Sequence, residues 1–260
     1  MDMRVWIFRR RHLQIAACAM LAVVAVTAYL WPGGVRAVAG QAAREIPIYS
    51  VDTVNKRIAI SFDAAWGDEK TLKILDVLDQ YNVKTTFFLV GFWVDAYPQH
   101  VQEIIARGHE IGNHSSTHPH MSELSADQIR MELNTTAQKI EALTDTKVAL
   151  FRPPFGDYNN RLVETCREMG ITPIQWDVDS LDWKNQGVEP MVQRVTSKVQ
   201  PGSIVLFHNN SEYIVESLSI IIEKLQKQGY EIVPVSQLIY PGDWTVDHTG
   251  KQMKPQASSD

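Results

Sequence analysis

Short apolar runs alternate with helix-like stretches along most of this chain, and this alternation constrains the fold more than any other feature. The apolar runs, which have the length of buried strands, lie at Arg57–Phe62, Thr85–Val90, Glu110–Gly112, Val148–Phe151, Thr172–Val178, Ser203–Phe207 and Glu231–Val235. The helix-like stretches lie at Glu69–Gln80, Gln99–Arg107, Ser125–Leu143, Asn159–Met169, Val188–Val199 and Tyr213–Gln228. Strands that alternate with helices predict an α/β fold with a mostly parallel sheet. About seven such units would close, or nearly close, a barrel.

Composition narrows the class of protein. The chain has 260 residues, of which 45% are hydrophobic and 21% charged, as expected for one large globular domain. Its formal net charge is -5 and no basic stripe stands out in the body, which argues against a nucleic-acid partner. Cys18 and Cys166 lie far apart in different settings, so both are interpreted as unpaired thiols.

The N-terminus predicts export. Three arginines and His12 precede an apolar segment at residues 13–31, close to the length that spans a bilayer. The positive-inside rule places residues 1–12 in the cytoplasm and the body outside it. Ala37-Val38-Ala39 resembles a cleavage site, so the segment is either an uncleaved membrane anchor or a cleaved signal.

The remaining chain divides by composition. Residues 32–54 contain several glycines and prolines and are interpreted as a linker, residues 55–240 as the main folded domain, and residues 241–260 as a polar tail.

Polar side chains, nearly all of them ionisable, follow most of the predicted strands. In a parallel barrel the active site forms at the carboxyl ends of the strands, so these residues are expected to share one face. They are Asp63, Asn113, His114, His118, Arg152, Asp177, Asp179, Asp182 and His208.

Each of these residues also has a structural interpretation. His114 and His118, four residues apart, could bind one metal ion or be two exposed loop histidines. Asp63 could be a metal ligand, a general base or a helix cap. His208 could be a simple hydrogen-bonded histidine, and Arg152, held extended by the prolines that follow it, could form a surface ion pair.

Five motifs occur in order and together resemble the polysaccharide deacetylase family, also called the NodB-homology family or carbohydrate esterase family four. They are Ser61-Phe62-Asp63, His114-Ser-Ser-Thr-His118, Arg152-Pro-Pro-Phe-Gly156, Asp179-Ser-Leu-Asp182-Trp183 and Leu206-Phe-His208. The resemblance covers roughly residues 55–240. It implies a distorted (β/α)7 barrel, preceded here by the N-terminal transmembrane or signal helix. The Asp-Ala-Ala-Trp-Gly sequence at 63–67 looks closest to the sporulation-associated, PdaB-type branch.

The resemblance also implies roles. Asp63 matches the catalytic base, Arg152 the residue that orients this base, His208 the general acid, and Asp182 the carboxylate that pairs with His208. His114 and His118 match ligands of a divalent metal, most often zinc, with cobalt, nickel or manganese as alternatives. The residues expected to wall the sugar groove are Trp183, Phe155, Pro154 and Leu206.

One departure from the family pattern affects the metal. The first motif usually carries two consecutive aspartates, the second of which binds the metal, and here that position is Ala64. Catalytic zinc normally has three protein ligands. Asp68 is a candidate substitute, Asp63 itself could bind the metal, or metal binding could be weak and activity low or absent.

The sequence favours two functions, ahead of a metal hydrolase that acts on a different amide or ester. The first is metal-dependent hydrolysis of the acetamide of an N-acetylated cell-wall glycan such as peptidoglycan, in sporulation or cell-wall modification. The second is a catalytically silent glycan-binding or structural cell-wall protein that keeps the fold, with Ala64 as its main support. The partners expected are the glycan and, through the N-terminal helix, the membrane.

Overall fold

The computed structural model describes residues 19–23 and 44–254. The chain divides into two units, Met1–Ala43 and Arg44–Asp260, which are considered separately. In the first unit residues 19–23 are helical, and most of the predicted segment at 13–31, with Cys18, lies outside the described residues. No helix within the described residues has the length and apolar character needed to cross a membrane.

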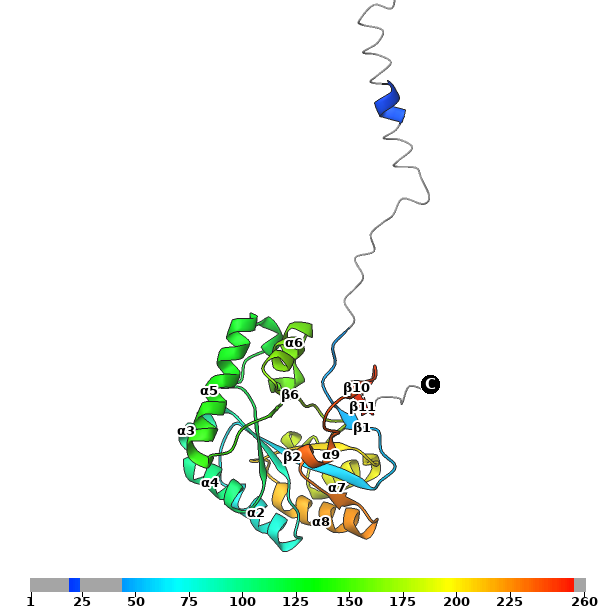
Figure 1. The fold of residues 1–260 in the computed structure, drawn as a ribbon. Helices are drawn as coiled ribbons and strands as arrows, with labels where there is room; N and C mark the ends of the chain where they lie inside the picture. Colours follow the sequence, from blue (N-terminus) through cyan, green and yellow to red (C-terminus); the bar gives the residue numbers. More distant parts are fainter. Residues whose placement is uncertain (1–18, 24–43, 255–260) are drawn as a thin grey trace, which may run out of the picture. The chain divides into compact units, whose positions relative to one another are not determined.

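The second unit is built on a curled parallel sheet (Figure 1). Its strand order is β6-β5-β4-β3-β2-β8-β7, and β9 pairs with the start of β2. The strands are β2 (Arg57–Ala64), β3 (Thr86–Leu89), β4 (Glu110–Asn113), β5 (Leu150–Phe151), β6 (Thr172–Pro173), β7 (Val178–Asp179), β8 (Ile204–His208) and β9 (Glu231–Ile232). This arrangement confirms the predicted distorted (β/α)7 barrel.

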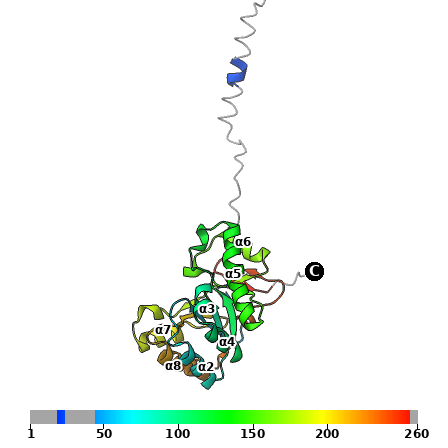
Figure 2. The ribbon, with the colours of Figure 1, turned by 90° about the vertical axis from the view of Figure 1, so that its left-hand side faces the viewer.

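Helices pack around this sheet, most of them on its outer face (Figures 1 and 2). They are α2 (Thr71–Gln80), α3 (Gly91–Ala96), α4 (Pro98–Ala106), α5 (Ala126–Thr144), α6 (Asn160–Glu168), α7 (Val188–Lys198), α8 (Ile214–Lys227) and α9 (Val235–Leu238), with the short 3-10 turns η1 (Met121–Glu123), η2 (Pro154–Gly156) and η3 (Asp182–Lys184). A capping box formed by Ser125 and Gln128 fixes the N-terminus of α5.

The central strand β2 shows how the core and the site are separated. Ile58, Ile60 and Phe62 point to the core between the sheet and its helices. Because successive side chains on a strand face opposite sides, Ser61 and Asp63 face the inside of the barrel, where both contact Arg152. The period of two in one strand therefore places apolar groups in the core and polar groups in the site.

The predicted strand Thr172–Val178 is wrong, since the structure divides it into β6 and β7 at opposite edges of the sheet. Between them the chain leaves one edge and joins the other. The Asp177 carboxylate accepts hydrogen bonds from Ile204 N and Ser203 Oγ, which fixes the chain at the β8 edge. The two edges of the sheet leave an open side. There the backbone N–H of Ile48 donates to Pro173 O, and Ile48 O accepts from Gln175 N. The sheet is therefore strongly curled, with the N-terminal segment of the body packed along its open side.

The segments on either side of the predicted domain also contain strands. β1 (Ser50–Val51) lies in the predicted linker, and it pairs with β11 (Lys251–Met253), which pairs with β10 (Thr245–Val246). The start of the body and its C-terminal segment thus form one small sheet, visible beside the barrel in Figure 1.

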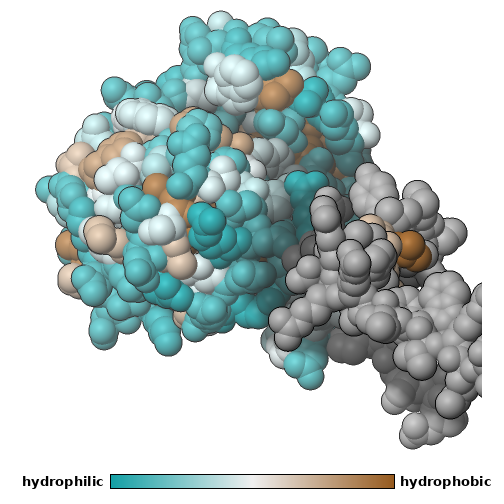
Figure 3. All heavy atoms as spheres, turned by 90° about the horizontal axis from the view of Figure 1, so that it is seen from above, coloured by the Kyte–Doolittle hydropathy of each residue, from teal (hydrophilic) through white to brown (hydrophobic). Residues whose placement is uncertain are grey.

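The surface is mostly polar, and Cys166 agrees with its interpretation as an unpaired thiol. On the face seen in Figure 3, hydrophilic residues prevail and apolar residues lie in small groups. Cys166 is a free, buried thiol whose pKa is raised by burial, so it acts as a small core residue.

Candidate active site

The carboxyl ends of the strands meet at one cavity of about 720 Å³. Asp63 is the second-last residue of β2 and His208 the last of β8, and the two residues are partners in the register of these neighbouring strands. His114 and His118 come from the loop after β4 and line the same cavity. Its wall also includes Trp66, Phe155, Trp176, Asp179, Trp183 and Leu206.

Asp63 and Arg152 form a buried ion pair. The Arg152 side chain is fully buried and its Nη1 donates to Asp63 Oδ1 at 2.8 Å. Burial alone would raise the pKa of Asp63, but the guanidinium and the two nearby histidines hold that pKa below its ordinary value. Asp63 is therefore ionised, with Oδ1 occupied by Arg152.

The buried guanidinium is held on several sides. Its Nη2 donates to Ser61 Oγ at 2.8 Å and to Gln175 O at 3.2 Å. The charged group also lies 4.1 Å from the centre of the Phe88 ring, a distance at which a cation is attracted to the ring face. Removal of one member of a buried ion pair costs about 3–5 kcal/mol, since it leaves the other charge unpaired. This pair therefore supports the fold as well as the site.

His114 is fixed as a neutral imidazole. Its Nδ1 lies 2.7 Å from Arg152 O, and a carbonyl oxygen can only accept, so Nδ1 carries the hydrogen. Burial lowers the pKa of His114. The second nitrogen, Nε2, thus presents a lone pair 3.5 Å from Asp63 Oδ2. A backbone carbonyl on one ring nitrogen is the usual arrangement behind a metal-binding histidine.

The loop that carries His118 is held by α5. Glu132 accepts hydrogen bonds from the backbone N–H of Ser116 and Thr117, and Thr136 donates to Ser115 O. His118 has a positive φ of 59°, a conformation that an L residue keeps only when its surroundings require it. Burial lowers the pKa of His118 to about 4, so its ring is neutral near pH 7.

The candidate ligands fit a divalent metal ion, although few side chains are available to bind it. Among the described residues, no three histidine, cysteine, aspartate or glutamate side chains converge as a ready metal cluster. His114 and His118 are both neutral, with ring centres 5.0 Å apart. Ligands of tetrahedral zinc at about 2.0–2.1 Å lie roughly 3.4 Å from one another, and His114 Nε2 and Asp63 Oδ2 are 3.5 Å apart. These three side chains would hold the ion.

His208 and Asp182 form the second charged pair. His208 Nδ1 lies 2.7 Å from Asp182 Oδ1, and His208 N donates to Asp182 Oδ2. Burial acts to lower the pKa of His208, but the hydrogen bond and charge of Asp182 outweigh it and raise this pKa above its ordinary value. A protonated imidazole at the cavity wall can donate a proton from Nε2.

Two residues expected at the site lie apart from it. The Asp68 carboxylate is 3.3 Å from His100 Nδ1 and is not among the residues that line the cavity. Pro154 is buried in η2 and does not line the cavity either. Of the expected groove residues, Phe155 and Trp183 are 60% and 57% exposed, and Leu206 is buried in the cavity floor.

Sequence reasoning missed two contributors. Trp66, three residues after Asp63, lines the cavity and packs edge-on against His118 at 4.9 Å. An aromatic residue directly after a strand end is a signal that could have identified it. Glu132, which holds the His118 loop, lies in the middle of an amphipathic helix, and nothing in its sequence position indicates that role.

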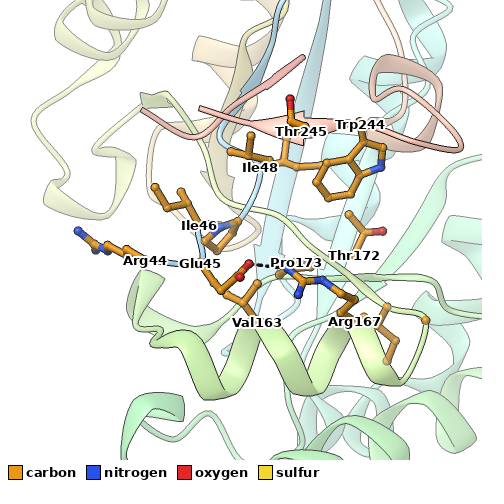
Figure 4. A pocket seen from close by; sticks show the side chains of 14 residues that line it. Arg44, Glu45, Ile46, Ile48, Val163, Arg167, Thr172, Pro173, Trp244 and Thr245 are labelled. Carbon is orange, nitrogen blue, oxygen red and sulfur yellow. Dashed lines mark hydrogen bonds and ion pairs between the residues drawn. The ribbon is translucent and has the colours of Figure 1, made fainter. Parts of the chain in front are cut away.

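A second cavity, of about 470 Å³, lies between the start of the body, α6 and β10 (Figure 4). Figure 4 shows Glu45 and Arg167 facing each other across it, joined as an ion pair. Trp244 and Ile48 form its apolar side. Because Glu45 and Arg167 in its wall are paired with each other, this cavity has fewer charged groups available to bind a ligand than the first cavity has.

Comparison with known sequences identifies relatives of this chain. Residues 50–174 match the polysaccharide deacetylase family. A peptidoglycan-N-acetylglucosamine deacetylase of Bacillus cereus is 36% identical over 196 residues, which cover 74% of this chain and 92% of that protein. The uncharacterized protein YlxY of Bacillus subtilis is 34% identical over 74% of this chain, and the match spans 60% of its length.

Solved structures of similar fold include active and inactive proteins. A family 4 carbohydrate esterase (CE4) pseudoenzyme of Bacillus anthracis is 38% identical, with a TM-score of 0.72, over 74% of this chain and 68% of that one. A mutant of that pseudoenzyme described as having restored enzymatic activity is 40% identical, with the same TM-score, over 74% of this chain and 70% of that one. PdaA of Bacillus subtilis, a family 4 carbohydrate esterase, is 31% identical with a TM-score of 0.71, over 74% of this chain and 84% of that one.

The His208–Asp182 pair can be tested by titration. Asp182→Asn removes the charge that raises the pKa of His208, so this pKa should fall. NMR titration of the His208 ring protons measures it directly. Asp179→Asn is the graded comparison: Asp179 lines the same cavity and raises the pKa of His208 through its charge alone, so its loss should lower this pKa less than Asp182→Asn does. Equal pKa values in wild type and Asp182→Asn would contradict the assignment.

Proposed function

Since this chain belongs to the polysaccharide deacetylase family, we propose that it hydrolyses the acetamide of an N-acetylated cell-wall glycan and releases acetate. The observation that carries the proposal is the placement of an ionised carboxylate and a protonated imidazole at one cavity. Asp63 has a lowered pKa and His208 a raised pKa, and they are partners in the register of neighbouring strands. Hydrolysis of the C–N bond of an amide needs one proton transfer to a base and one from an acid, and so needs groups in these opposite states.

Asp63 would act as the base through its second carboxylate oxygen. Oδ1 is held by Arg152, while Oδ2 faces His114 and the cavity. Oδ2 would take a proton from the water that attacks the acetamide carbonyl. The low pKa of Asp63 keeps this oxygen ionised and ready, and the rigid Arg152 contact fixes its direction.

His208 would act as the acid. Its Nδ1 is engaged by Asp182, which fixes the ring and keeps it protonated. Nε2 is then the nitrogen that donates a proton to the departing sugar amine. Loss of that amine without a proton would leave a strongly basic anion, so this transfer makes the C–N bond breakable.

His114 and His118, with Asp63, would hold a divalent metal ion, for which zinc suits the imidazole ligands best. When bound, the ion polarises the acetamide carbonyl and lowers the pKa of the attacking water. The protein contribution is the two neutral imidazoles, one of them fixed by the Arg152 carbonyl.

The setting proposed is outside the cytoplasm, in sporulation or cell-wall modification, with the chain either anchored by its N-terminal segment or secreted after cleavage. The basic residues before the apolar run at 13–31 support export. The relatives act on two different sugars by name, an N-acetylglucosamine deacetylase and an N-acetylmuramic acid deacetylase. The proposal therefore covers N-acetylated cell-wall glycan as a class.

The function is tested by acetate release from N-acetylated peptidoglycan, with the full chain in detergent and with or without added zinc. Wild type should release acetate in a metal-dependent way. His208→Gln should lower turnover by about 10²–10⁴-fold, the usual contribution of a general acid, without changing zinc binding. His208 is the better target for substitution because its side chain is 37% exposed, whereas Asp63 supports the buried Arg152. Unchanged turnover in His208→Gln would remove it as the acid.

A catalytically silent glycan-binding protein is the second candidate function, and Ala64 supports it. Ala64 ends β2 with its methyl group in the hydrophobic core, where the family pattern has a second aspartate. The similar pseudoenzyme structure shows that a member of this family can lose activity, and its altered form is described as restored.

Ala64→Asp separates the two candidates. If wild type is active, the added carboxylate should increase its turnover. It should also tighten zinc binding by at least about tenfold, the size of effect that one supporting group has on a metal site. If wild type is silent, turnover should appear only in the variant. Ala65→Asp is the matched control: it adds a carboxylate at the adjacent residue, which lines the cavity but does not occupy the position of the missing aspartate. Circular dichroism checks the fold first, because position 64 is buried.

A further inference from the structure

The three side chains that would hold the metal are fixed in two different ways. Arg152 fixes two of them, because its guanidinium holds Asp63 and its backbone carbonyl holds the ring of His114. His114 also follows β4 directly. His118 lies four residues further on, in a loop at residues 115–118 that belongs to no strand. The position of His118 therefore depends on how this loop is held.

The loop has a backbone conformation that needs support from its surroundings. Ser115 and His118 both have a positive φ, of 69° and 59°. Residues with a side chain adopt this conformation rarely, and keep it where neighbouring groups hold it in place. The contacts around the loop therefore decide whether the His118 ring faces the proposed metal site.

Every backbone N–H of the loop donates to a side chain. The first and the last donate to Asn113 Oδ1 and to Ser115 Oγ, which lie at the end of β4 and within the loop itself. The two middle ones, of Ser116 and Thr117, both donate to Glu132 Oε2, at 2.7 and 2.8 Å. Glu132 Oε1 accepts from the Thr117 hydroxyl at 2.8 Å. One carboxylate from α5 thus receives three hydrogen bonds from the middle of the loop.

The other contacts hold the first half of the loop. Thr136 Oγ1 and the backbone N–H of Gly91 both donate to Ser115 O. A Cβ at Gly91 would lie 2.7 Å from Thr136 Oγ1 and 3.0 Å from a Cα of the loop, so the start of α3 packs closely here. α3 and α5 lie side by side (Figure 2). Glu132 is the contact that reaches the residue directly before His118.

The helix that carries Glu132 is itself firmly placed. Ile129 and Leu133, on either side of Glu132, are fully buried and pack with Phe151 of β5. Leu133 O also accepts a hydrogen bond from Asn113 Nδ2 at 2.8 Å, which joins α5 to the end of β4. The Glu132 carboxylate is therefore presented to the loop from a rigid element.

We propose that Glu132 is a positioning residue that holds His118 in place for metal binding and thereby sets the metal affinity of the site. The inference rests on the proposed function in taking His114, His118 and Asp63 as the metal-binding side chains. Its weight comes from Ala64: without a second aspartate, a displaced His118 leaves two protein ligands where catalytic zinc normally has three.

Calorimetric titration of the full chain in detergent with zinc tests the proposal. Glu132→Ala should weaken zinc binding by about 10- to 100-fold, the usual effect of losing a group that orients a metal ligand. Glu132→Gln should bind with intermediate affinity, because its neutral amide oxygen accepts the same two hydrogen bonds less strongly. Glu141→Ala is the matched control: it makes the same change at an exposed residue of α5 and should leave zinc affinity unchanged.

Hydrogen exchange without metal gives a second readout, independent of the ion. The amides of Ser116 and Thr117 should exchange faster in Glu132→Ala than in Glu141→Ala, while those of Ile111 and Gly112 in β4 keep their wild-type rates. Zinc bound by Glu132→Ala as tightly as by wild type, or unchanged exchange of the two loop amides, would overturn this proposal alone. A wild type that binds no zinc would overturn it together with the proposed metal site.

Discussion

The contact between Arg152 and Asp63 is the interaction on which the site depends. The same residue engages Asp63 through its side chain and orients His114 through its backbone carbonyl. Its backbone N–H also donates to Asn113 O, which aligns the ends of β4 and β5. One buried arginine thereby sets the ionisation of the base, the tautomer of a metal-binding imidazole and the register of two strands. Such a charge is tolerated in the interior because Ser61, Gln175 and Phe88 surround it.

Much of the site could be predicted because parallel strands bring their carboxyl ends to one face. Asp63, His114, His118 and His208 were identified in this way, and they line one cavity. The sequence pattern was less informative about strands that pair with segments far away in the chain. The division of 172–178 into two edge strands depends on Asp177 binding the β8 edge, which no local period reveals. The short pairing of β1 with β11 joins segments about 200 residues apart, with no apolar run to mark them.

Because Ala64 stands where the family has a second aspartate, one oxygen atom of Asp63 must perform two tasks. Because Oδ1 is bound by Arg152, Oδ2 is the oxygen left both to meet a metal ion and to accept a proton from water. With a second aspartate these tasks would be divided between two carboxylates. Trp66 and Phe155 line the same cavity, and both rings contact the His118 ring edge-on. Substrate bound on these rings would also enclose the imidazole, so glycan binding and metal binding are expected to reinforce each other.

The central claim is that His114, His118 and Asp63 hold a metal ion without the missing aspartate. Diffraction from crystals of the protein soaked in zinc, recorded at the zinc absorption edge, tests it most directly. The account predicts one anomalous peak within bonding distance of His114 Nε2 and the His118 ring, next to Asp63 Oδ2. Crystals that contain zinc elsewhere but show no peak between these two imidazoles would contradict it, and would favour a protein that binds glycan without cleaving it.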